Sequence, residues 1–163
     1  MILDIAKWKE EISRLRSNLE SSFNCNNDFQ IERDLYYLAI AIRKLMENRL
    51  APTGMGTESL NISRYVRKLD VVDGLNYLDA DAQFNLDNGQ KDQMKRKRLF
   101  DIIIHSTFLD WRLRNGCAVE LLLSSDYHAK ALGIPPSQLL TLIDSIVATE
   151  FKNFPLPSAR RTS

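Results

Sequence analysis

The chain has 163 residues, of which 44% are hydrophobic and 26% are charged, so its composition is that of one globular domain and excludes a chain too polar to form a core. The formal net charge is +1, which excludes a global attraction to nucleic acid or to an anionic membrane. Cys25 and Cys117 form neither a CxxC pair nor a metal-ligand spacing, which predicts reduced thiols in a cytoplasmic protein.

The N-terminal region predicts two helices. Apolar residues recur at steps of three and four along residues 2–19, as in an amphipathic helix, and charged residues within this stretch interrupt the apolar run that a signal peptide needs. Residues 24–27 are polar and predict a loop. Asp28 is a predicted N-cap for a second amphipathic helix, which ends at the proline and glycines of residues 51–56. The short loop favours an antiparallel helical hairpin.

The middle of the chain has weaker patterns. Residues 58–69 predict a short helix, and the aspartate-rich stretch 70–87 contains two candidate strands at 71–72 and 76–78. The sequence Asp-Asn-Gly at 87–89 predicts a turn.

The following residues predict a helix and then a hairpin. A strong helix is expected from about 91 to about 108, beginning with a basic turn and becoming apolar. Asn-Gly at 115–116 is typical of a hairpin turn and predicts a β-hairpin over residues 108–125. The alternative is that the helix continues through Trp111.

The last predicted element is an apolar helix that begins at Pro135 or Pro136 and ends before Pro155. We therefore expect a single domain over residues 1–154 and a disordered tail over 155–163. The predicted fold class is α+β, mainly helical with about four helices and a small antiparallel β-hairpin or sheet in the second half. No apolar run approaches the roughly 20 residues of a membrane span, so a membrane partner is not expected.

One face of the predicted helix at 91–108 carries residues suited to catalysis. At about 100° per residue, Arg98, Asp101 and His105 lie on the same side of a helix. Asp101 and His105 are four residues apart, so the carboxylate is expected to orient the imidazole and raise its pKa. His105 would then serve as a general acid or base, and Arg98 would hold a phosphate.

A run of four basic residues, Lys95, Arg96, Lys97 and Arg98, is a candidate contact for RNA. The alternative is that these residues have no catalytic or RNA-binding role. The basic run is then a solvated helix face, and His105 is buried or half-buried after three isoleucines. The glycines at 54–56 are accompanied by neither a strand nor a GK[ST] sequence, so they are not interpreted as a phosphate-binding loop.

Two resemblances extend this reading. The segments 33–49, 100–108 and 120–132 resemble a group of uncharacterised bacterial proteins, which implies one intact domain and no assigned activity. Arg98, six residues and His105 form a motif similar to that of HEPN-type domains, helical proteins found as ribonuclease toxins or in antiviral systems. This second resemblance implies a metal-independent ribonuclease, acting as a dimer.

Three classes of function follow from the sequence. The first is a non-catalytic interaction module, a homodimer or a subunit of a larger bacterial system; Tyr36 and Tyr37 are interpreted as core or interface aromatics. The second is the HEPN-like ribonuclease of a toxin or defence system, with Arg98, Asp101 and His105 as its catalytic residues. The third is a sensor that binds a small ligand between the helices and the hairpin. No cofactor and no metal ion are expected.

Overall fold

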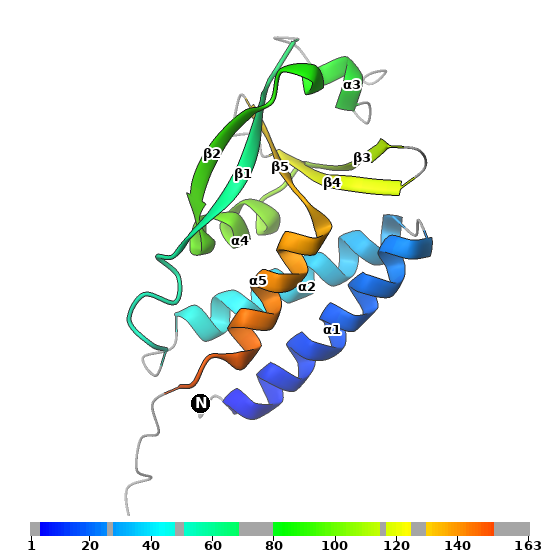
Figure 1. Cartoon of the computed structure of the whole chain (residues 1–163). Helices are drawn as coiled ribbons and strands as arrows, with labels where there is room; N and C mark the ends of the chain where they lie inside the picture. Colours follow the sequence, from blue (N-terminus) through cyan, green and yellow to red (C-terminus); the bar gives the residue numbers. More distant parts are fainter. Residues whose placement is uncertain are drawn as a thin grey trace, which may run out of the picture.

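The computed structural model describes residues 4–25, 28–47, 51–68, 80–114, 117–124 and 130–151. Helices α1 (Ile5–Cys25), α2 (Asp28–Met46), α4 (Arg96–Ile104) and α5 (Pro136–Ala148) gather on one side of a five-stranded sheet (Figure 1). The fold is therefore α+β, as the sequence predicts.

The sheet is antiparallel throughout. Its strands are β1 (Ser59–Val66), β2 (Gln90–Lys95), β3 (Phe108–Arg114), β4 (Cys117–Ser124) and β5 (Lys130–Ile134). They lie in the order β2-β1-β5-β4-β3. The antiparallel pairs β1–β2 and β3–β4 are thus joined through β5, which pairs with β1 on one side and β4 on the other.

Both faces of the sheet bury apolar residues, because alternate side chains of a strand point to opposite faces. The face toward the helices contributes to the main core through Leu60, Ile62, Leu121, Leu123, Leu132 and Ile134. On the other face, Tyr65, Phe108, Leu122 and Ala131 form a smaller cluster with residues of the short helix α3 (Ala80–Gln83) and the 3-10 turn η1 (Leu86–Asn88).

The helical predictions at the two ends of the chain are confirmed. Helices α1 and α2 pack as an antiparallel pair (Figure 1), and their core stripes include the fully buried Ile12, Leu19, Leu35 and Ile42. Helix α5 begins at Pro136, in whose first turn proline costs no hydrogen bond. No helix in the described ranges combines the length and the apolarity needed to cross a membrane.

Two helical predictions in the middle are wrong. Residues 59–66 form β1 instead of a helix, and the buried Leu60 and Ile62 alternate with exposed residues. The helix expected over 91–108 is shorter at both ends, because residues 90–95 pair with β1 as strand β2 and Phe108 already belongs to β3. Pairing between distant segments thus overrides the local pattern.

The predicted hairpin over residues 108–125 is confirmed as β3 and β4, so the alternative helix through Trp111 is wrong. The candidate strands at 71–72 and 76–78, the turn at 115–116 and the tail at 155–163 lie outside the described residues.

Candidate functional site

The predicted catalytic residues lie along α4 and just beyond it. Arg98 and Asp101 line a cavity of about 470 Å³ between the start of α4, the end of α2 and the turn that precedes β1. We call this the α4 cavity; residues that define it include Met46, Pro52, Gly56, Lys95, Lys97 and Arg98. His105 is not among its lining residues. The structure therefore brings two of the three predicted residues into one cavity.

Asp101 has an ion-pair partner that the sequence does not suggest. Its carboxylate contacts the guanidinium of Arg43 on α2, and Arg43 also pairs with Glu47 one turn further along that helix. Since the side chain of Asp101 is engaged with Arg43, the structure adds no support for a role in orienting His105. Asp101 instead ties α4 to α2.

His105 caps the C-terminal end of α4 and is exposed. The alternative without a catalytic role, in which His105 is buried or half-buried, is therefore wrong about its position. Its backbone N–H donates to the carbonyl oxygen of Asp101 at 3.1 Å. The chain leaves the helix at this point, with Ser106 donating its hydroxyl to the carbonyl of Ile103 at 2.9 Å. The imidazole is therefore open to solvent two turns from Arg98.

Acidic neighbours balance much of the basic run. Arg96 pairs with Glu58 at 2.6 Å, and Lys97 lies 3.6 Å from Glu47. Glu58 directly precedes β1 and Glu47 directly follows α2, so these contacts hold the basic run beside the start of β1 and the end of α2. A surface that binds a long polyanion needs uncompensated positive charge, so the pairing weakens the case for the run as an RNA track.

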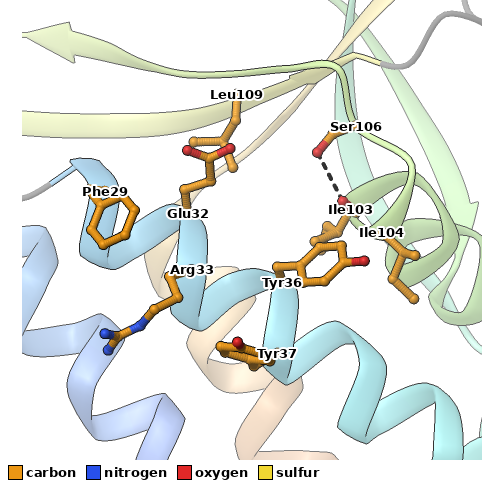
Figure 2. A pocket seen from close by; sticks show the side chains of 9 residues that line it. All are labelled: Phe29, Glu32, Arg33, Tyr36, Tyr37, Ile103, Ile104, Ser106 and Leu109. Atoms are coloured by element: carbon orange, nitrogen blue, oxygen red, sulfur yellow. Dashed lines mark hydrogen bonds between the residues drawn. The ribbon is translucent and has the colours of Figure 1, made fainter.

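A second concave surface lies at the opposite end of the α2–α4 pair (Figure 2). Its volume is about 390 Å³. We call it the α2 groove and define it by Phe29, Arg33, Tyr36, Tyr37, Ile104 and Leu109. Aromatic side chains from α2 form one wall, and residues of α4 and β3 form the other, as Figure 2 shows.

The aromatic residues of the α2 groove are unusually exposed for their type. Phe29 is 73% exposed, Tyr37 56% and Tyr36 43%. The two tyrosine rings meet edge-on with centroids 6.3 Å apart. Three exposed rings on a helix whose other face is fully packed form a second apolar stripe. Such a surface commonly marks an interaction site.

The charges of the α2 groove are mixed. Arg33 donates from Nε at 3.0 Å and from Nη2 at 2.9 Å to one oxygen, Oδ1, of the buried Asp34, and the other oxygen of Asp34 accepts from the amide of Gln30 at 2.6 Å. Glu32 contributes an acid to the same wall. The groove is therefore aromatic with one acid and one paired base, rather than basic.

A buried polar cluster lies on the sheet face away from α1, α2 and α5. Tyr65 donates its hydroxyl to the carboxylate of Glu120 and accepts a hydrogen bond from Arg112 at 3.2 Å. Tyr65 is 2% exposed and Glu120 7%. Burial, and then the hydrogen bond to Glu120, raise the pKa of Tyr65 above its ordinary value. This cluster joins β1, β3 and β4 across β5 and has a structural role.

Within the described residues, no three His, Cys, Asp or Glu side chains gather into a group that could hold a metal ion. Comparison with protein families, with curated proteins and with solved structures finds no match.

Proposed function

We propose that the protein is a non-catalytic interaction module that binds a second copy of itself through the α2 groove. The observation that carries this proposal is the exposed aromatic stripe of Phe29, Tyr36 and Tyr37 on α2. Aromatic residues and arginine are enriched in the cores of protein interfaces, where they contribute most of the binding energy. The rings are presented by a helix that is fixed by the core, so little conformational entropy is lost on binding.

A second copy suits the charge pattern of the α2 groove. In a two-fold interface the same patch meets itself, so it must be complementary to itself. Glu32 and Arg33 are adjacent, so each acid can face a base of the other copy when two grooves meet in antiparallel orientation. A nucleic acid fits this surface less well, because Glu32 and Asp34 together outnumber the single base Arg33, so the α2 groove offers no excess positive charge to a polyanion.

Sedimentation velocity over a wide concentration range tests the proposal. Wild type is expected to show a reversible dimer. The double variant Phe29→Ser with Tyr37→Ser is expected to weaken self-association at least about tenfold, since burial of one large apolar side chain contributes roughly 1.5–3 kcal/mol. Both side chains are exposed, so folding is expected to persist.

The matched control is Leu113→Ser on β3, whose side chain is 54% exposed and lies outside the α2 groove. It is expected to leave the dimer intact. A wild type that is monomeric at every concentration refutes the proposal. Equal weakening by the control variant shows that the contact is non-specific.

The HEPN-like ribonuclease is the second candidate, favoured by the exposed imidazole of His105 two turns from Arg98. RNA cleavage without added metal, lost in both Arg98→Ala and His105→Ala while folding is retained, would support it. Cleavage that persists in His105→Ala excludes this mechanism, because the residue that moves the proton is then absent.

A further inference from the structure

The sheet has two outer strands, β2 and β3, one at each end of the order β2-β1-β5-β4-β3 (Figure 1). Within the described residues, each of them pairs with one neighbouring strand only. The outer side of such a strand presents backbone N–H and C=O groups to which a strand of another molecule can pair. The outer sides of β2 and β3 therefore decide whether the sheet can be extended.

The hydrogen-bond alternation shows which N–H groups of β2 point outward. The N–H of Arg96 donates at 2.9 Å to the carbonyl of Glu58, the residue opposite it just beyond the end of the β1–β2 pair. Facing residues of an antiparallel pair exchange hydrogen bonds at every second position, so the even-numbered residues of β2 bond to β1. The N–H of Gln93 therefore points away from β1, and it donates to Oδ1 of Asp92 at 2.6 Å. This hydrogen bond lowers the pKa of Asp92 below its ordinary value, so the acceptor is a carboxylate at neutral pH.

The same alternation continues across the sheet to β3, since each strand bonds to its two neighbours through alternate residues. From β1 across β5 and β4, it makes hydrogen-bonded pairs of Ser63 with Gly133, Leu132 with Leu123, and Leu122 with Asp110. The N–H of Trp111 therefore points away from β4, and it donates to Oδ1 of Asp110 at 2.7 Å. A register shift between Arg112 and Leu113 then interrupts the regular pairing of β3.

We infer that Asp92 and Asp110 keep the two outer strands from pairing with a strand of another molecule. In both strands a carboxylate occupies the outward N–H group of the next residue. The carbonyl oxygen of an added strand would meet that carboxylate in place of a free donor, and two acceptors form no hydrogen bond. The added strand would also remove water from a charged group without giving it a new partner, which is unfavourable.

The inference also limits how a second copy can bind at the α2 groove. Leu109 of β3 lines that groove, so the outer side of β3 borders it. Because Asp110 occupies the N–H of Trp111, a second copy in the groove contacts side chains, and the two sheets do not join into one. This consequence rests on the proposed dimer, whereas the block at the outer strands does not depend on it.

Removal of both carboxylates tests the inference. The double variant Asp92→Ala with Asp110→Ala frees one outward N–H group in each outer strand and adds no large apolar side chain. Sedimentation velocity and thioflavin T fluorescence of the full chain measure the concentration at which assemblies larger than a dimer form. We expect this concentration to be at least about tenfold lower than for wild type, since free N–H groups then become available for pairing. The control, Glu10→Ala with Glu150→Ala, removes two exposed acids outside the sheet and is expected to behave as wild type.

The same measurement in the background of Phe29→Ser with Tyr37→Ser separates the outer strands from the α2 groove. The increase in association caused by the two alanines is expected to persist there, because it uses β2 and β3. If the double variant does not fold, the single variant Asp92→Ala, at an exposed position, decides the question for β2.

Three results would overturn the inference. The first is a variant that folds, as circular dichroism shows, and associates no more readily than wild type. The second is an equal increase in the control, because the loss of net charge is then the cause. The third is loss of the increase in the Phe29→Ser and Tyr37→Ser background, since the association would then use the α2 groove.

Discussion

Removal of one hydroxyl group from Tyr65 tests the buried cluster on the far face of the sheet. The variant Tyr65→Phe keeps the ring packed but takes away the donor to Glu120 and the acceptor for Arg112. The carboxylate of Glu120 then retains Arg112 only at 3.8 Å. Hydrogen bonds to charged groups contribute about 1.5–3 kcal/mol, so the free energy of unfolding is expected to fall by about 2 kcal/mol.

The same variant predicts a pH dependence. The pKa of Tyr65 is raised in the folded protein, first by burial and then by the hydrogen bond to Glu120, so the folded state holds the phenolic proton more tightly than the unfolded chain does. The resulting stability is fully present below the ordinary tyrosine pKa of 10.0 and is lost as the pH rises through the raised value. The difference in the free energy of unfolding between wild type and Tyr65→Phe should therefore become smaller above about pH 10.

Urea unfolding followed by circular dichroism, at about pH 7 and about pH 11, measures both effects. The exposed Tyr37→Phe serves as the control and is expected to change stability by less than about 0.5 kcal/mol. A Tyr65→Phe variant as stable as wild type near neutral pH refutes the assigned hydrogen bonds. If Tyr65→Phe is less stable than wild type by the same amount at about pH 11 as at about pH 7, the stability of wild type does not depend on the ionisation of Tyr65.

Three further predictions concern packing and ion pairing. Gly133→Ala should lower the free energy of unfolding by about 1–3 kcal/mol, because its Cβ would overlap Glu120 and approach Tyr65 to 2.8 Å; an unchanged urea midpoint would contradict this. Leu35→Ala, at a fully buried position between α1 and α2, should cost about 2–5 kcal/mol in the same assay, and a loss below 1 kcal/mol would mean that the helical pair is loosely packed. A double-mutant cycle of Arg43→Ala and Asp101→Ala should give a coupling energy of about 0.5–1 kcal/mol, whereas the cycle of Asp101→Ala and His105→Ala should give almost none. A larger coupling energy between Asp101 and His105 than between Asp101 and Arg43 would instead support the carboxylate–imidazole pair that the sequence predicts.

The parts of the fold that the sequence predicts are those whose stability comes from one continuous apolar stripe. Helices α1, α2 and α5 each carry such a stripe, and the Asn-Gly turn signals the β3–β4 hairpin. Strand β2 has no comparable signal, because its residues are exposed except for Met94. It is a strand only because β1 lies beside it, and that pairing joins residues about thirty positions apart.

Strand β5 escaped prediction for a different reason. It is buried on both faces, with Leu132 and Ile134 in the main core and Ala131 and Gly133 under Tyr65 and Glu120. A short apolar run without alternation does not distinguish a central strand from a loop or a helix. Only the closure of the whole sheet gives these five residues their conformation.

The candidate site was partly predictable. Helical spacing places Arg98 and Asp101 on one side of α4, and the structure agrees that both line one cavity. The partner of Asp101 is Arg43, which is far away in the sequence and invisible to spacing within one helix. For the α2 groove, the sequence leaves Tyr36 and Tyr37 as either core or interface aromatics, and the structure places them with Phe29 outside the core stripe of α2.

The central position of β5 has a consequence for synthesis on the ribosome. Until residues 130–134 emerge, β1–β2 and β3–β4 are separate ribbons, and each presents a strand whose partner has not yet been made. Helix α5, which packs on α1 and β4, follows directly after β5. The edge of β1 therefore waits for its partner from the completion of β2 at Lys95, and the edge of β4 waits from Ser124, until the arrival of one strand covers both.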